Sequence, residues 1–120
     1  MAKDVQPHRK ASGCTPPRER STSRRLAILD STFITTLRTA AATAVAAKYL
    51  ARNDASTVTV VGCGMQGRAS LEALLLVRPI REAYAFDVDG AAAERFASEM
   101  QASLDIKVRV AATLDDAIAQ

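Results

Sequence analysis

Short, mainly apolar runs alternate with segments of helical spacing along the second half of this 120-residue chain. The apolar runs, rich in β-branched, alanine and aromatic residues, cover residues 57–61, 82–87 and 108–111. The segments of helical spacing cover residues 65–77, 91–104 and 114–120. Continuous apolar strands that alternate with helices are typical of a parallel sheet with helices on its faces. The pattern therefore predicts an α/β fold in which three strands are arranged in the order 3-2-1.

A long alanine-rich helix is predicted before the first strand. Residues 26–29 are a short apolar strand candidate, and either Asp30 or Ser31 after it can cap a helix. The composition favours helix from Thr32 to Arg52. Apolar residues at helical spacing predict one buried face, made of Ile34, Leu37, Ala41, Val45 and Tyr49.

The first 25 residues differ from the rest in composition. They hold seven Lys or Arg and two acidic residues, a net charge of +5, whereas residues 26–120 hold nine basic and eleven acidic residues, a net charge of −2. Pro, Gly, Ser and Thr mixed with basic residues predict a disordered, solvated tail. The tail lacks interleaved aromatic residues that would favour a nucleic-acid-binding arm, and its acidic residues Asp4 and Glu19 argue against a transit peptide. We therefore expect no nucleic-acid partner.

Cysteine usage and hydropathy indicate a cytoplasmic protein. Cys14 and Cys63 give no disulfide framework, which favours a reducing compartment. No apolar run reaches the roughly 18–20 residues that a membrane span needs, so we expect no membrane partner.

A glycine-rich turn, Gly62-Cys63-Gly64-Met65-Gln66-Gly67, connects the first predicted strand to the helix after it. In this context Gly62 permits a tight turn, Gly64 lets the backbone approach phosphates, and Gly67 lets helix and strand pack closely. The helix N-terminus then points its free N–H groups at the anion. Cys63 is either a reactive thiol at this N-terminus or a small residue between glycines, and we favour the second interpretation.

Asp87 ends the second predicted strand, 20 residues after Gly67. A carboxylate at this position binds the ribose hydroxyls of an adenosine and repels a 2′-phosphate, so it favours NAD over NADP. Asp87 could instead serve as a turn residue or helix cap, but the glycine turn upstream favours the ribose role. Together these features predict a partial Rossmann-type doubly wound parallel sheet.

Arg38 lies in the alanine-rich helix between Thr36 and Thr39. It is either a surface charge or a bidentate donor which, beside hydroxyl groups, suits a carboxylate or phosphate. The residues alone leave both interpretations open.

These segments together resemble the ornithine cyclodeaminase / mu-crystallin family, which also contains an alanine dehydrogenase branch. The resemblance covers roughly residues 26–120. The segments that carry it are Ile34–Ala42, Ala46–Arg52, Gly62–Gly67, Leu71–Leu74 and Asp87. The Arg-Thr-Ala-Ala helix and the glutamine inside the glycine turn are specific to this family, and neither has a role in an S-adenosylmethionine-dependent methyltransferase.

The resemblance implies bound NAD(H) and an amino-acid substrate. It implies that Arg38 contacts both the substrate carboxylate and the cofactor, that Met65 and Gln66 contact the pyrophosphate, and that Asp87 holds the adenosine ribose. In ornithine cyclodeaminases an α-amino group is oxidised to an imine, ammonia is lost on cyclisation, and the ring imine is reduced to proline. A dehydrogenase of the family couples hydride transfer to oxidative deamination, and mu-crystallin-like relatives bind a nucleotide or ligand without catalysis.

The family also has a substrate domain before the Arg-Thr-Ala-Ala helix and a catalytic aspartate well after the third strand. Residues 1–25 do not resemble that domain, so we expect no catalytic residue in this chain. The predicted organisation is a disordered basic tail (1–25), a strand plus linking helix (26–54), and a truncated NAD-binding domain (55–120). We expect a homodimer for the full-length parent. The isolated chain is expected to aggregate, because strand 57–61 has an open edge.

Overall fold

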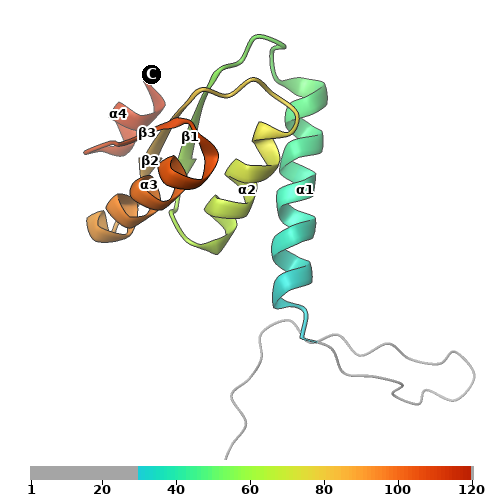
Figure 1. Cartoon of the computed structure of the whole chain (residues 1–120), viewed down its shortest axis with the longest axis horizontal. Coiled ribbons are helices and arrows are strands. Elements are labelled where there is room, and N and C mark those ends of the chain that lie inside the picture. Colours follow the sequence, from blue (N-terminus) through green and yellow to red (C-terminus); the bar gives the residue numbers. More distant parts are fainter. Residues whose placement is uncertain (1–29, 120) are drawn as a thin grey trace, which may run out of the picture. The chain divides into compact units, whose positions relative to one another are not determined.

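The computed structural model describes residues 30–119 of the chain (Figure 1). The chain separates into two units, Met1–Thr35 and Thr36–Gln120. In the described part of the first unit, the Asp30 carboxylate accepts a hydrogen bond from Thr32 N at 2.9 Å, where helix α1 (Thr32–Leu50) begins. This bond lowers the pKa of Asp30 and satisfies the first N–H group of the helix. The carbonyl of Ser31 accepts the first bond of the helix, from Thr35 N at 2.7 Å, so Ser31 occupies the N-cap position and both predicted candidates lie at the helix start. The predicted strand 26–29 and tail 1–25 lie outside the described residues.

A three-stranded parallel sheet forms the centre of the second unit. Its strands are β1 (Thr57–Val61), β2 (Glu82–Phe86) and β3 (Lys107–Val110). The order β1-β2-β3 and the parallel pairing agree with the prediction. Each strand is followed by a helix, in turn α2 (Met65–Leu75), α3 (Gly90–Leu104) and α4 (Leu114–Ile118). The predicted α/β fold with a partial Rossmann-type sheet is therefore confirmed.

The hydrophobic core lies between one face of the sheet and the helices α2 and α3. Alternate strand residues point to this face, because side chains along a strand alternate between faces. Phe96 and Leu71 are its largest fully buried side chains. Phe96 and Met100 lie on the buried side of α3, with Ala97 packed beside them. The remaining buried members of the cluster are Val60, Cys63, Ala83, Ala85, Ala93, Ile106 and Val108.

Helix α4 packs on β1 and β2. The Thr59 hydroxyl donates a hydrogen bond to Ala117 O at 2.5 Å. Thr59 alternates with Val58 and Val60 of the core, so α4 covers the opposite face of the sheet. The Thr113 hydroxyl accepts a hydrogen bond from Asp116 N at 3.1 Å, so Thr113 caps α4. Helices therefore lie on both faces, as in a doubly wound sheet.

Strand β1 is less buried than its sequence predicted. The continuous apolar run indicated burial on both faces, but Val60 is its one buried residue and Thr57 and Val61 are exposed. Among the described residues β1 pairs with β2 alone, so its outer edge is open. Burial of Thr57 and Val61 would need further chain beside β1.

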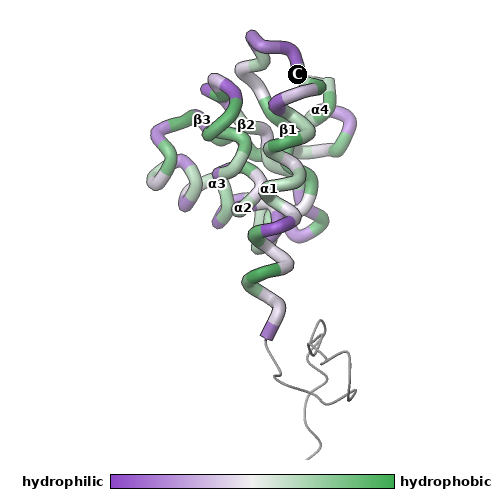
Figure 2. The backbone as a smooth tube through the Cα atoms, turned by 90° about the vertical axis from the view of Figure 1, so that its right-hand side faces the viewer, coloured by the Kyte–Doolittle hydropathy of each residue, from purple (hydrophilic) through white to green (hydrophobic). Residues whose placement is uncertain are grey.

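The prediction that the apolar face of α1 is buried is wrong. Its members Ile34, Leu37, Ala41, Val45 and Tyr49 are all exposed. The buried residues of α1 are Ala40 and Ala44, which line one groove with Ala69 and Ala73 of α2. Figure 1 shows α1 running beside α2, and Figure 2 shows hydrophobic and hydrophilic segments mixed along α1. Small size rather than high hydrophobicity therefore marks the buried side of α1.

An arginine side chain ties the end of α1 to the segment after α2. Arg78 Nη2 donates hydrogen bonds to Lys48 O at 2.7 Å and to Ala51 O at 3.0 Å. Lys48 lies in the last turn of α1 and Ala51 follows its last residue, so no N–H group of the helix is available to bond these carbonyls.

Candidate functional site

The glycine turn lies at the carboxyl ends of β1 and β2. Gly62 follows β1 directly and its N–H donates a hydrogen bond to Phe86 O at 2.8 Å. Its φ angle is +94°, a region that favours glycine over residues with a side chain. The structure thus confirms the tight turn predicted for Gly62.

The other two glycines face different surroundings. A Cβ atom on Gly67 would lie 2.2 Å from Gly62 O and 3.1 Å from a methyl group of Val60. Gly67 therefore lets α2 pack closely on β1, as predicted. A Cβ atom on Gly64 would meet nothing within 4 Å. The space in front of Gly64 is open to a ligand, as its predicted role requires.

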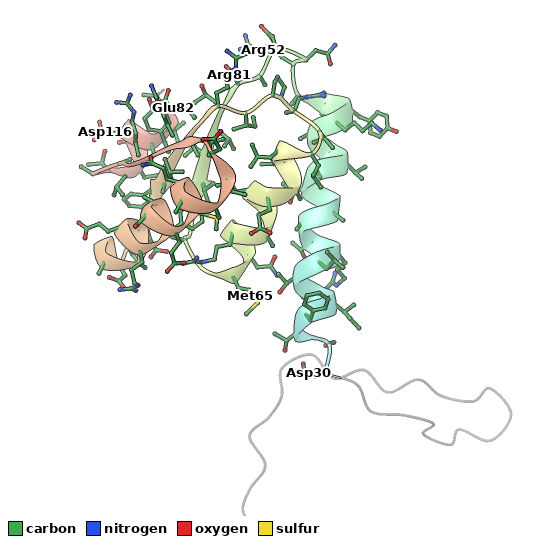
Figure 3. All side chains as sticks on the ribbon, viewed as in Figure 1. Asp30, Arg52, Met65, Arg81, Glu82 and Asp116 are labelled. Atoms are coloured by element: carbon green, nitrogen blue, oxygen red, sulfur yellow. The ribbon has the colours of Figure 1, made fainter. Side chains whose placement is uncertain are left out.

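Helix α2 begins with free donors. Gly64 is its N-cap residue and provides no side-chain hydrogen bond to the first turn. The first N–H groups of a helix have no acceptor within the helix, and they lie at the positive end of its dipole. Met65 and Gln66 in this first turn are exposed. Figure 3 shows Met65 at this end of α2, away from Arg81 and Glu82 at the amino end of β2. The arrangement can bind an anion such as phosphate.

Asp87, directly after β2, joins the glycine turn to the loop before α3. Its Oδ2 accepts a hydrogen bond from Cys63 N at 2.7 Å, and its Oδ1 accepts one from Asp89 N at 3.0 Å. These two bonds lower the pKa of Asp87, so the carboxylate is ionised at neutral pH. A carboxylate can accept about four hydrogen bonds, which leaves room for two ribose hydroxyls. Asp89, not Asp87, caps α3, with its Oδ1 accepting from Ala91 N at 3.0 Å.

Cys63 is a buried residue of the turn. It is 3% exposed and its thiol lies 3.7 Å from Phe86 O. Burial, with a smaller effect of the Asp87 charge, raises the pKa of the Cys63 thiol. A protonated, buried thiol is a poor nucleophile, which favours the interpretation of Cys63 as a small packing residue.

A hollow of about 550 Å³ adjoins the turn. It extends along the open edge of β1, from Val58 to Val61, and under the inner side of α2 at Ser70, Leu71 and Leu74. Gly62, Gly64 and the first turn of α2 form its other wall. The space therefore lies where both the exposed backbone of the turn and the unpaired edge of β1 can be reached.

Arg38 is not brought to the glycine turn. It is exposed and forms no hydrogen bond or ion pair with residues 30–119. Two helical residues turn the side chain by roughly 200°, so Arg38 points away from the α2-facing side marked by Ala40. The Thr36 hydroxyl, on that side, lies 3.2 Å from the sulfur of Met65. The substrate- and cofactor-binding role of Arg38 stays a prediction.

Sequence reasoning missed the main-chain partner of Asp87. The N–H group of Cys63 donates to one carboxylate oxygen of Asp87. A backbone donor cannot be recognised from the residue types in a sequence. It also missed Arg78, whose side chain leaves no pattern that separates a helix-capping arginine from a surface one.

Between residues 30 and 119, no group of three or more His, Cys, Asp or Glu side chains could hold a metal ion. No helix in this part of the chain is long and apolar enough to cross a membrane.

Comparison with known proteins gave consistent matches. The alanine dehydrogenase of Archaeoglobus fulgidus is 49% identical over 73 residues, which are 61% of this chain and 23% of that protein. The structure of the Thermococcus litoralis Delta(1)-pyrroline-2-carboxylate reductase in complex with NADH and L-proline matches with a TM-score of 0.75 and 38% identity. It aligns with 83% of this chain and 31% of its own. An archaeal alanine dehydrogenase dimer with bound NAD matches with a TM-score of 0.72 and 40% identity, over 82% of this chain and 30% of its own.

This chain thus spans about a quarter to a third of the length of the relatives that it matches. The matched family profile covers residues 17–120, including part of the segment before α1. The glycine turn and the two strand ends around it fall within that range. The chain belongs to the ornithine cyclodeaminase/mu-crystallin family.

Proposed function

We propose that this chain is the NAD(H)-binding portion of an ornithine cyclodeaminase-like enzyme, which converts L-ornithine to L-proline and ammonia. The observation that carries the proposal is the pairing of the glycine turn with Asp87, whose Oδ2 lies 2.7 Å from Cys63 N. The bound NADH and NAD named for two related structures support the choice of cofactor.

The residues of the turn would hold the cofactor in two places. The N–H groups at the start of α2 would bind the pyrophosphate above Gly64, with Met65 and Gln66 beside it. The free lone pairs of Asp87 would accept hydrogen bonds from the adenosine ribose. An ionised Asp87 repels a 2′-phosphate, so the site selects NAD over NADP.

The reaction also needs chemical groups that the cofactor-binding residues named above do not supply. When bound, the nicotinamide would accept a hydride from the substrate carbon and return one to a ring imine. Arg38 is the residue of this chain that we assign to the substrate carboxylate, because its planar guanidinium suits bidentate binding. We assign no proton transfer to any residue of this chain.

Direct titration tests the cofactor assignment. We expect the purified chain to bind NADH at least tenfold more tightly than NADPH, and S-adenosylmethionine not at all, by calorimetry. Asp87→Asn should reduce the ratio of the dissociation constants for NADPH and NADH. Asp89→Asn removes the nearby charge of the residue that caps α3 and should leave this ratio nearly unchanged. Tighter binding of NADPH than of NADH would count against the role of Asp87.

Alternative functions within the family differ in their products. An alanine-type dehydrogenase or an imine reductase is favoured by the names of the relatives reported above. Both change the amount of NADH during turnover, whereas a cyclodeaminase releases ammonia without net change in NADH. A non-catalytic mu-crystallin-like protein would bind nucleotide and do neither. We expect the chain alone to be inactive, so release of ammonia from ornithine by the purified chain would contradict our assignment of no proton transfer to its residues.

The proposal includes assembly and location. We infer a homodimer for the full-length protein, because a related structure is a dimer. We infer a cytoplasmic location, where the buried Cys63 thiol stays reduced. The chain alone should self-associate through the open edge of β1, as measured by sedimentation at increasing concentration.

A further inference from the structure

The side chain of Asp87 connects two loops that come from different strands. One carboxylate oxygen accepts from Cys63 N in the turn after β1, and the other accepts from Asp89 N in the loop after β2. The contact with Cys63 is made from a residue 24 positions later in the chain. Asp87 therefore contacts the glycine turn directly, through its backbone.

The turn has few other restraints at this point. Gly62 adopts a positive φ angle and Gly64 has no side chain, so the backbone on either side of Cys63 has wide conformational freedom. The hydrogen bond from Gly62 N to Phe86 O holds the first residue. The bond from Cys63 N to Asp87 holds the second, immediately before the chain enters α2 at Gly64.

We propose that Asp87 is a positioning residue for the phosphate site, holding the glycine turn in its phosphate-binding shape through Cys63 N–H, in addition to accepting from ribose. The inference rests on the proposed function, because it assigns the start of α2 to phosphate. One side chain would then affect both the ribose-binding and the pyrophosphate-binding part of the cofactor site.

The ribose role and the positioning role of Asp87 predict opposite effects of its removal on the affinity for an anion. A carboxylate beside an anion-binding turn repels the anion. If Asp87 acted on ribose alone, its removal would leave the affinity for a ligand without ribose unchanged or raise it. If Asp87 holds the turn, removal of its oxygens lowers that affinity despite the lost repulsion.

The experiment uses inorganic pyrophosphate as the probe, with binding followed by calorimetry or by amide chemical shifts. Asp87→Ala removes both the charge and the acceptor oxygens, whereas Asp87→Asn removes the charge and keeps an oxygen that can accept from Cys63 N. We expect Asp87→Ala to weaken pyrophosphate binding at least threefold, and Asp87→Asn and the control Asp89→Asn to bind as tightly as the unaltered chain or more tightly. Binding by Asp87→Ala as tight as that by Asp87→Asn would overturn the proposal.

Amide hydrogen exchange separates this proposal from the proposed function. Exchange of the Cys63 amide should be at least tenfold faster in Asp87→Ala than in the unaltered chain, and unchanged in Asp89→Asn. Should the unaltered chain bind neither pyrophosphate nor NADH, the proposed function fails, while this exchange rate still reports whether Asp87 holds the turn. An unchanged rate in Asp87→Ala overturns the proposal. Asp87→Ser, whose hydroxyl is shorter, provides the same comparison where Asp87→Ala does not fold.

Discussion

Hydrophobic residues are placed differently in two regions of the chain. The first region is the sheet with helices α2 and α3, and the second is helix α1. Around the sheet the largest side chains are inside, and Phe96 and Leu71 are fully buried. On α1 the buried residues are Ala40 and Ala44, whereas the ring of Tyr49 is 75% exposed. Hydrophobicity thus marks the buried face in the first region, and small size marks it in the second.

Two aromatic substitutions should separate these regions most strongly. Phe96→Ala should lower the free energy of unfolding by about 3–5 kcal/mol, because it removes a fully buried ring and leaves a cavity. Tyr49→Ala should change it by less than about 0.5 kcal/mol, because the ring is largely in water. Chemical denaturation of the two variants measures both values. An equal cost for Tyr49→Ala would show that the exposed face of α1 is covered in solution.

The same difference explains what could be predicted from the sequence. The three strands and α3 were predicted because short apolar runs alternate with segments of helical spacing, and such a pattern marks burial directly. The buried side of α1 was not predicted, because residues such as Leu37 are more hydrophobic than the alanines that are buried. Which neighbour a helix meets, and how closely, depends on tertiary packing that its own sequence does not contain.

The candidate site divides along similar lines. Gly62 and Gly67 were predicted correctly, because turn geometry and close packing restrict these positions to glycine. The hydrogen bond between Asp87 and Cys63 N could not be predicted, because every residue except proline has a backbone donor. Arg38 was grouped with the turn by resemblance alone, and its exposed position opposite Ala40 follows from the packing of α1.

Glycine substitutions in the turn should have the next largest effect. Gly67→Ala places a Cβ atom 2.2 Å from Gly62 O, so α2 must move away from β1. We expect a loss of about 1–3 kcal/mol in unfolding free energy, measured by denaturation. Gly64→Ala is the matched control, because its Cβ atom meets nothing within 4 Å, and the expected change is below about 0.5 kcal/mol. A larger loss for Gly64→Ala would contradict the assigned roles.

A smaller effect is expected at the contact between Arg78 and α1. Arg78→Met keeps the apolar length of the side chain and removes the bonds to Lys48 O and Ala51 O. The loss should be about 1–2 kcal/mol, because these partly exposed bonds also satisfy the last carbonyls of the helix. Hydrogen exchange should become faster at the end of α1 and stay unchanged in α3.

Arg52→Met is the control for this substitution. Arg52 forms an ion pair with Asp54 at 3.6 Å, in which both side chains are more than four-fifths exposed. Exposed pairs contribute little, so we expect a change below about 0.5 kcal/mol. Similar losses for the Arg52 and Arg78 variants would mean that the guanidinium of Arg78 does not hold α1 in place.

The smallest effect should appear in the dependence of stability on pH. The hydrogen bonds from Cys63 N and Asp89 N lower the pKa of Asp87 in the folded chain. A lowered folded pKa stabilises the fold above the unfolded value of about 3.9, and the contribution is lost as the pH falls through the folded value. The difference in unfolding free energy between the unaltered chain and Asp87→Asn should therefore be constant near neutral pH and shrink below about pH 4. Asp30, whose pKa is also lowered, accepts its hydrogen bond from Thr32 N at the start of α1, so the same denaturation series in an Asp30→Asn background should keep this trend. A difference that stays constant down to pH 2 would mean that the carboxylate of Asp87 gains nothing from its two backbone donors.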